Sequence, residues 1–257
     1  MKFRVTIILL AAFPLFSQSP ATPRPAFDIA SVKASLSNEG YMDATPGGRF
    51  VATGIPLRML ITDAYRLRNV QIIGGPSWLD SDRWDIEGRP KAEDAVPAPP
   101  PAKLDPAQPS RENLMLQSLL EDRFQFKFHW EKRELGVYEL TVAKGGPKFK
   151  ESNGVPPGRP RFRGGRGNLE AYEISIATFV YFLRLDRIII DGTNLKGLYD
   201  LSLKWTPETA QGTEPATLPE QPSIFTAIQE QLGLRLEATK SPVEVLVIDS
   251  VHKPSAN

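Results

Sequence analysis

The stretch that decides the fold spans residues 47–88 and reads GGRFVATGIPLRMLITDAYRLRNVQIIGGPSWLDSDRWDIEG. Its apolar spacing predicts a short strand, an amphipathic helix, a second strand, a glycine turn and a third strand. A diverged copy spans residues 167–205 and reads GNLEAYEISIATFVYFLRLDRIIIDGTNLKGLYDLSLKW. Near their ends the copies carry Trp84-Asp85-Ile86 and Tyr199-Asp200-Leu201. The order of apolar positions therefore indicates an internal repeat.

The first helix of each copy has a clear beginning. Pro56 suits the start of a helix because its missing N–H has no partner there, and the matching Ser175 is a good N-cap. In the first copy Leu57, Leu60 and Ile61 fall on one helix face. The opposite face is polar, so we expect it to be solvated.

A second helix and two further strands follow each copy. The helices are expected at 114–124 and 224–232, preceded by the capping residues Ser110 and Ser223, and the strands at 124–128, 137–142, 232–236 and 243–248. The sequence predicts an α+β fold of two pseudo-symmetric β-α-β-β-α-β-β repeats, with mainly antiparallel sheets packed by helices. Two unrelated halves that look alike by chance remain the alternative.

The expected domain organisation follows from these repeats. Residues 1–21 are predicted to be a signal peptide, 26–150 repeat one, 151–166 a basic Gly/Pro linker, and 167–257 repeat two. The opening strand FDIASVK resembles both YELTVAK and VEVLVID, so we expect both termini to lie in one sheet. Segments 88–110, 152–165 and 208–220 are expected to be the least ordered internal parts, because they are rich in Pro, Gly and polar residues.

The N-terminus is typical of a secretory signal. Lys2 and Arg4 precede an apolar run over residues 5–16, and cleavage is expected between Ser17 and Ala21. The run is shorter than the roughly 20 residues that span a bilayer, although an uncleaved anchor remains the alternative. The sequence therefore predicts an exported protein, periplasmic or extracellular, without a transmembrane segment after cleavage.

Composition narrows the chemistry. The 257 residues include no Cys and only two His, and the formal net charge is +1. Disulfides, thiolate nucleophiles and cysteine metal sites are excluded, and no metal or organic cofactor is expected. The near-neutral charge gives no general attraction to nucleic acid. The basic stretch 144–167 is interpreted as a solvated linker, with contact to an anionic polymer as the weaker alternative.

The densest cluster of functional residue types surrounds Trp78, Asp82 and Arg83. Its aspartates are expected to cap a turn, although they could also ligate a hard cation. A charged strand end follows later, with His129 and Arg133, and it is interpreted as a solvated hairpin turn, with a binding rim as the alternative. If a ligand or partner site exists, we expect these five residues to form it, because aromatic, acidic and basic groups would converge there.

No catalytic motif accompanies this cluster. The chain has no G-x-S-x-G elbow, no H-E-x-x-H zinc motif and no phosphate-binding or dinucleotide-binding glycine pattern. The sequence favours a non-catalytic binding or sensing module of the cell envelope, whose partner would be an envelope protein or peptide. A secreted hydrolase with an unrecognised active site is the alternative.

Many ordered blocks resemble the soil-associated bacterial protein family. They are FDIASVK, GGRFVATGIPLRMLITDAY, GGPSWLDSDRWDIEG, LLEDRFQFKFHWEKREL, YELTVAKGGPK, YDLSLKWTPE and PSIFTAIQEQLGLRLE with PVEVLVIDSVHKP. The resemblance implies an exported protein built on a domain of unknown function, which some relatives carry behind an antibiotic-sensor-type membrane metallopeptidase. It implies no activity, cofactor or catalytic residue.

Overall fold

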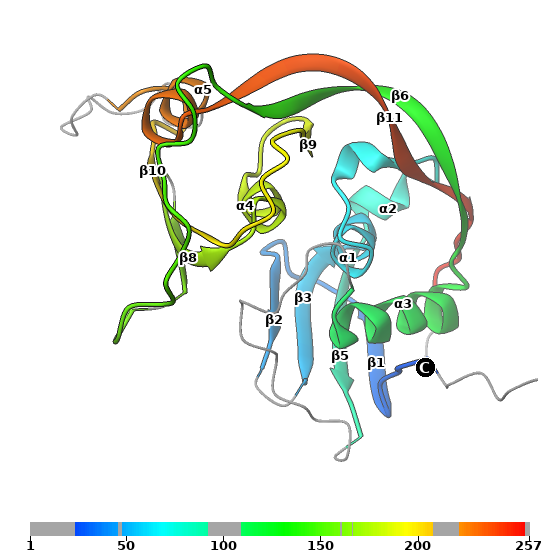
Figure 1. Ribbon diagram of the computed structural model, residues 1–257. Helices are drawn as coiled ribbons and strands as arrows, with labels where there is room; N and C mark the ends of the chain where they lie inside the picture. The colour runs from blue at the N-terminus through cyan, green and yellow to red at the C-terminus, as the bar shows by residue number, and fades with distance from the viewer. Residues whose placement is uncertain are drawn as a thin grey trace, which may run out of the picture.

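The structure, a computed structural model, describes residues 24–45, 48–91, 109–159, 161–165, 167–207 and 221–254. The predicted signal peptide and the segment 208–220 lie outside the described residues, as does most of the segment 88–110. The described part of the chain forms two lobes joined by a long two-stranded ribbon (Figure 1).

Lobe one is built on an antiparallel four-stranded sheet that carries helices on one side (Figure 1). In sheet order its strands are β1 (Ile29–Ala34), β5 (Arg83–Arg89), β3 (Phe50–Pro56) and β2 (Tyr41–Ala44). Its helices are α1 (Leu57–Ala64), the one-turn α2 (Trp78–Ser81) and α3 (Arg111–Phe124), with a 3₁₀ turn η1 (Asn69–Gln71). Helix α1 buries Leu57, Leu60, Ile61 and Ala64, which is the apolar face that the sequence predicts.

Lobe two contains a smaller antiparallel sheet. Its strands, in order, are β10 (Tyr199–Lys204), β8 (Asn168–Ile174) and β7 (Phe162–Gly165). Its helices are α4 (Ile176–Phe182), α5 (Ile224–Ala227) and the π-helical turn η5 (Ile228–Leu232). Strand β7 falls within the stretch 151–166 that the sequence predicts as a linker, and it pairs with β8.

The ribbon consists of β6 (Lys127–Val142) and β11 (Leu234–Ser250), which pair antiparallel along almost their whole lengths. Two short strands add to its edges in parallel: β4 (Ile72–Ile73) beside β11 and β9 (Ile188–Asp191) beside β6. The fold is therefore α+β with mainly antiparallel sheets, and this part of the prediction is confirmed.

Two expectations about strands are wrong. The pairs of strands predicted at 124–128 with 137–142, and at 232–236 with 243–248, are each one continuous strand. The termini do not share a sheet either, because β1 pairs with β5 whereas β11 pairs with β6. The charged residues in the middle of β6 look like a turn in sequence, but they occupy an exposed, fully paired strand.

The ribbon connects two separate hydrophobic cores. Lobe one packs Phe50, Leu60 and Phe124 against Leu246 and Ile248, which come from the far end of β11. The core of lobe two contains Phe179 and Leu201 together with Tyr138 and Leu140, from the far end of β6. Each core is thus completed by a strand that begins at the other lobe.

Both lobes contain the same local feature where the central strand meets its helix. Gly54 in β3 has φ +63°, and its N–H donates to Asp85 Oδ1 at 2.9 Å. Glu173 in β8 has φ +55°, and its N–H donates to Asp200 Oδ1 at 3.0 Å. In both sheets the strand register shifts beside this residue. The left-handed residue turns the strand into the following helix, and the aspartate satisfies its amide.

Helix caps follow the sequence closely. Ser110, Ser175 and Ser223 each accept a hydrogen bond from the amide three residues later, at 3.1, 3.1 and 3.2 Å. These N-caps satisfy amides that have no partner within the helix.

Candidate functional site

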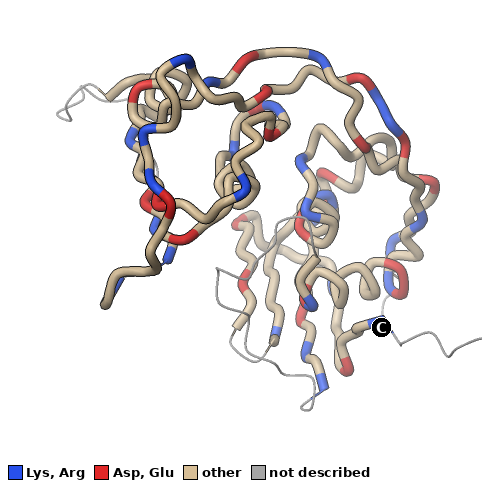
Figure 2. The backbone as a smooth tube through the Cα atoms, viewed as in Figure 1, with Lys and Arg blue, Asp and Glu red and all other residues tan. Residues whose placement is uncertain are grey.

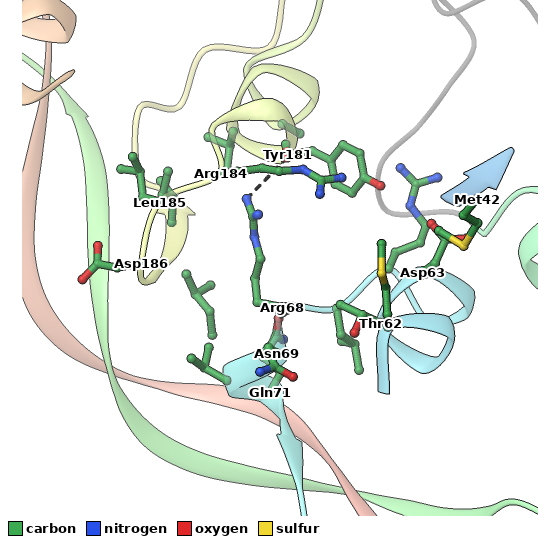
Figure 3. Close-up of a pocket in the computed structure, with 18 residues that line it drawn as sticks. Met42, Thr62, Asp63, Arg68, Asn69, Gln71, Tyr181, Arg184, Leu185 and Asp186 are labelled. Carbon is green, nitrogen blue, oxygen red and sulfur yellow. Dashed lines mark hydrogen bonds between the residues drawn. The ribbon is translucent and has the colours of Figure 1, made fainter. Parts of the chain in front are cut away.

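A cavity of about 590 Å³ lies between the lobes. We call it the interlobe cleft. Helix α1, the loop after it and η1 line one side, and helix α4 with the loop leading into β9 lines the other (Figure 3). Its charged lining residues are Asp63, Arg66, Arg68, Arg184 and Asp186, and its apolar lining residues are Met42, Met59, Leu67, Val70, Ala177, Val180, Leu185, Ile188 and Ile189.

The sequence periodicity explains why these side chains face the cleft. The apolar stripe of α1 points into core one, so Met59, Thr62 and Asp63 lie on the opposite face. In α4 the buried residues include Ile176 and Phe179, which leaves Val180 and Tyr181 lining the cleft. Two helices of separate lobes thus present their outer faces to the same cavity.

Arg68 links the two lobes across the cleft. Its Nη2 donates to the carbonyl oxygen of Leu183 at 2.8 Å, just after the C-terminal end of α4. It also donates to the carbonyl oxygen of Tyr181 at 3.4 Å (Figure 3). A cation at this position also complements the partial negative charge of the helix end. Burial, and next the neighbouring charge of Arg184, lower the pKa of Arg68. Arg68 therefore serves mainly to hold α4 against lobe one.

Arg66 and Arg184 form no ion pair with a carboxylate of the described residues. The Arg66 guanidinium lies 4.5 Å from the Tyr181 ring centroid, a cation–π geometry. Its Nε is buried and has no hydrogen-bond partner. Arg184 forms no hydrogen bond or ion pair with any described residue, whereas arginines such as Arg49 and Arg58 are paired with carboxylates. The guanidinium groups of Arg66 and Arg184 therefore lie beside the cavity with N–H donors that form no hydrogen bond to the described residues.

Asp63 lies among these arginines without a direct partner in the described structure. Burial raises the pKa of its carboxyl, while the charges of Arg184 and Arg66 oppose that rise. Glu112, near the start of α3, also has a raised pKa, caused first by burial and then by the charges of Asp63 and Asp43. The second acidic lining residue, Asp186, is 3.6 Å from Arg187 Nε. A partly buried carboxyl with a raised pKa in a cavity is a common property of functional sites.

The residues predicted from the Trp78 cluster lie at the far side of lobe one, next to the C-terminal segment. The Trp78 ring packs edge-to-face on Trp84, with centroids 6.4 Å apart, and Lys253 Nζ lies 5.6 Å from the Trp78 centroid. Lys253 also pairs with Asp82 at 2.6 Å, which lowers the pKa of that carboxyl. Arg83 donates to the carbonyl oxygen of Gly54 at 2.7 Å. All three contacts hold local structure together.

His129 and Arg133 lie along the ribbon. His129 Nδ1 is 2.8 Å from Asp249 Oδ1, and Arg133 Nη2 donates to Glu131 Oε2 at 2.9 Å. These pairs are exposed, and such surface pairs contribute little to stability. Within the described part of the chain, no hydrogen bond, ion pair or ring contact joins either one to Trp78, Asp82 or Arg83. The convergence of all five remains a prediction, and the interlobe cleft is a separate place.

Sequence reasoning missed the cleft. Asp63 and Arg66 belong to the polar helix face that the sequence predicts to be solvated, and no motif singles out Arg68, Tyr181 or Arg184. The aligned copies contain one sign of the cleft. In both helices, the face that points away from the hydrophobic core carries polar or medium-sized side chains. Only the packing of the lobes, however, brings residues more than a hundred positions apart together.

Charge elsewhere is mixed rather than concentrated. Figure 2 shows basic and acidic residues scattered over both lobes and along the ribbon. The described residues contain no group of three or more His, Asp or Glu side chains placed to hold a metal ion. Within the same residues, no helix is both long and apolar enough to cross a membrane.

Comparison with known proteins identifies the family. No curated protein and no solved structure matches the chain. A family described as "Protein of unknown function (DUF3738)" matches residues 58–251, which extends from α1 to the residue after β11. That span includes both sides of the interlobe cleft, except for Met42. The chain therefore belongs to the DUF3738 family of proteins of unknown function.

Proposed function

We propose that the protein is a non-catalytic binding module of the cell envelope and that it takes its ligand in the interlobe cleft. One observation carries the proposal. A cavity of about 590 Å³, large enough for a small ligand, contains the guanidiniums of Arg66 and Arg184 without carboxylate partners among the described residues. Guanidinium donors beside an apolar wall suit a ligand that has both a charged and an apolar part.

The lining favours binding over catalysis. Thr62 is the hydroxyl side chain on α1, and its Oγ1 donates to the carbonyl oxygen of Arg58 at 2.5 Å. No lining carboxylate or imidazole is hydrogen-bonded to a hydroxyl, as an activated nucleophile needs. The alternative, a hydrolase, has one observation in its favour: the raised pKa of Asp63 would suit a general acid.

We also propose that the two halves are copies of one unit, related by an approximate two-fold axis through the ribbon. The bulges at Gly54 and Glu173 support this proposal, as do the aspartates that cap them. So do the left-handed residues that end the second helices, Gln125 at φ +47° and Gly233 at φ +65°. The cleft would then lie on the axis, between the equivalent helices α1 and α4.

Export remains a proposal that rests on the N-terminal sequence. The basic Lys2 and Arg4 followed by an apolar run support cleavage between Ser17 and Ala21, with a periplasmic or extracellular destination. The partner would then be an envelope peptide or protein, or a small molecule present there. N-terminal sequencing of protein from the producing cell tests it: a mature start within that window is expected, and an intact Met1 in the cytosol would refute export.

A variant that fills the cleft tests the proposed function. Ala177 is exposed on α4 and lines the cavity, so Ala177→Trp should block the cleft without disturbing either core. Ala34→Trp is the matched control, because Ala34 is exposed at the end of β1. Mature protein is incubated with envelope extract, and the small molecules that it retains are identified by native mass spectrometry.

The wild type and Ala34→Trp are expected to retain a compound that Ala177→Trp loses. Equal retention by all three proteins would show that the ligand binds outside the cleft. Each protein is also tested on a hydrolase panel. Turnover that Asp63→Asn abolishes would establish the hydrolase alternative, whereas retention that disappears in Trp78→Ala with Arg133→Ala would favour the site predicted from the sequence.

A further inference from the structure

We propose that the interlobe cleft binds a small hydrophobic carboxylic acid, a molecule with one carboxylate and an apolar body. This inference rests on the proposed function, because it names the ligand class of the same site. It combines two features of the lining: a charged end formed by arginines, and an apolar wall that is open to solvent.

The charged end offers donors suited to a carboxylate. The Arg66 guanidinium lies over the Tyr181 ring, 4.5 Å from its centroid, and this contact helps to hold the guanidinium in place. Arg184 comes from the other lobe and has no ion-pair partner among the described residues. A guanidinium presents its donors as a planar fork, and that fork matches the two oxygens of a carboxylate.

The local charge balance favours a negatively charged ligand group. Arg66, Arg68 and Arg184 each carry a positive charge, and the hydrogen bonds of Arg68 to the carbonyl oxygens of Tyr181 and Leu183 leave its charge in place. Asp186 lies beside Arg187, outside the arginine cluster. The three guanidiniums therefore face the single carboxylate of Asp63, and a carboxylate on the ligand would lessen this excess of positive charge.

The apolar lining favours a ligand that has an apolar body as well as a charged group. Met59 on α1 is 45% exposed and Val70 in η1 is 47% exposed, so both present apolar surface to the cleft. Val180 and Leu185 face them from lobe two. A small inorganic anion would leave this surface in water, whereas an apolar body would cover it. Methionine also adapts to ligands of different shape.

Calorimetry on the mature full-length protein tests the ligand class with decanoate as the probe. Decanamide has the same apolar body without the charge, and acetate has the charge without the body. Decanoate is expected to bind at least about tenfold more tightly than either of them, since each lost feature removes on the order of one strong interaction. Decanamide binding as tightly as decanoate would overturn the role of the arginines.

Variants of the cleft arginines, compared with a matched control, show which side chains bind the carboxylate of decanoate. Arg184→Gln alone, and Arg66→Gln with Arg184→Gln, are expected to weaken decanoate binding about tenfold or more. Arg163→Gln removes one exposed arginine of β7 outside the cleft and should leave the affinity unchanged. Arg184 is exposed, so its substitution does not threaten folding. Equal affinity in the Arg184 and Arg163 variants would refute the proposal.

A second pair of probes separates two sources of the same chemistry. N-acetyl-Leu-Val with a free carboxylate represents a peptide end, and its C-terminal amide is the control. Tighter binding of the free acid than of decanoate indicates a peptide source, and the reverse order indicates a fatty acid. If neither acid binds, but Ala177→Trp still loses a compound from envelope extract, this inference fails while the proposed function stands.

Discussion

The two central units of the molecule reach the same backbone for different reasons. In lobe one the left-handed position before the helix is Gly54, and a Cβ there would lie 2.4 Å from the carbonyl oxygen of Glu39. In lobe two the same position is Glu173, whose side chain pairs with Arg161. The backbone turn and its aspartate cap are common to both, whereas the side chain is set by the neighbouring segment. Geometry can thus persist where residue identity does not.

The largest expected effect comes from the strand that each lobe takes from the other. Leu246 is fully buried in core one although it belongs to the C-terminal strand. Leu246→Ala should lower the free energy of unfolding by about 2–5 kcal/mol, because it leaves a cavity in a packed core. Hydrogen exchange should show the loss of protection in β3 and α1. A loss confined to residues 168–204 would contradict the shared core.

Exchanging the two left-handed residues is the next test. Gly54→Glu should destabilise the protein by about 3 kcal/mol, because it combines a strained φ with an overlap against backbone. Glu173→Gly should change stability by less than about 1 kcal/mol, since a lost ion pair is offset by an easier backbone conformation. Urea denaturation of both variants measures the difference. Equal effects would show that the surroundings of the two positions do not differ as described.

Removing each aspartate cap tests how similar the two lobes are at this position. Asp85→Ala and Asp200→Ala each leave one amide, that of Gly54 or Glu173, without its partner. Each should cost about 1–3 kcal/mol, which is typical for an unsatisfied buried donor. The two losses in urea denaturation should be similar. A neutral result at one site alone would weaken the proposal that the halves are copies of one unit.

The smallest effect concerns Asp63 and is visible mainly in its pH dependence. Its folded-state pKa is raised above the ordinary value of 3.8, so the folded protein binds the proton more tightly than the unfolded chain. Stability should fall as the pH rises from 3.8 to the raised pKa, and the cost then persists at neutral pH. The charges of Arg66, Arg184 and Glu112 lie near this carboxyl and affect the pH range over which stability falls.

Asp63→Asn should therefore be more stable than the wild type at pH 7 and similar to it at pH 3.5. Asp186→Asn, which changes the same charge elsewhere on the cleft, is the control and should show no such crossover. Thermal unfolding at both pH values measures the difference. A gain for Asp63→Asn that is equal at both values would refute burial as the cause.

Local features of this fold are predictable from sequence, and long-range ones are not. The apolar spacing of Leu57, Leu60 and Ile61 and the caps at Ser110 and Ser175 depend on neighbouring residues, so the sequence contains their signal. The continuity of β6 through Glu131 and Arg133 depends on pairing with β11, and a charged stretch without apolar alternation gives no sign of it. The cleft depends on how two lobes pack, which no local pattern specifies.

A structure of the mature protein with bound decanoate tests the central claim most directly. The account predicts electron density in the interlobe cleft, with the carboxylate oxygens within about 3 Å of guanidinium nitrogens of Arg66 or Arg184, the usual range for such contacts. The hydrocarbon chain of decanoate should extend along Met59 and Val180. Density beside Trp78 or His129, with an empty cleft, would contradict the account.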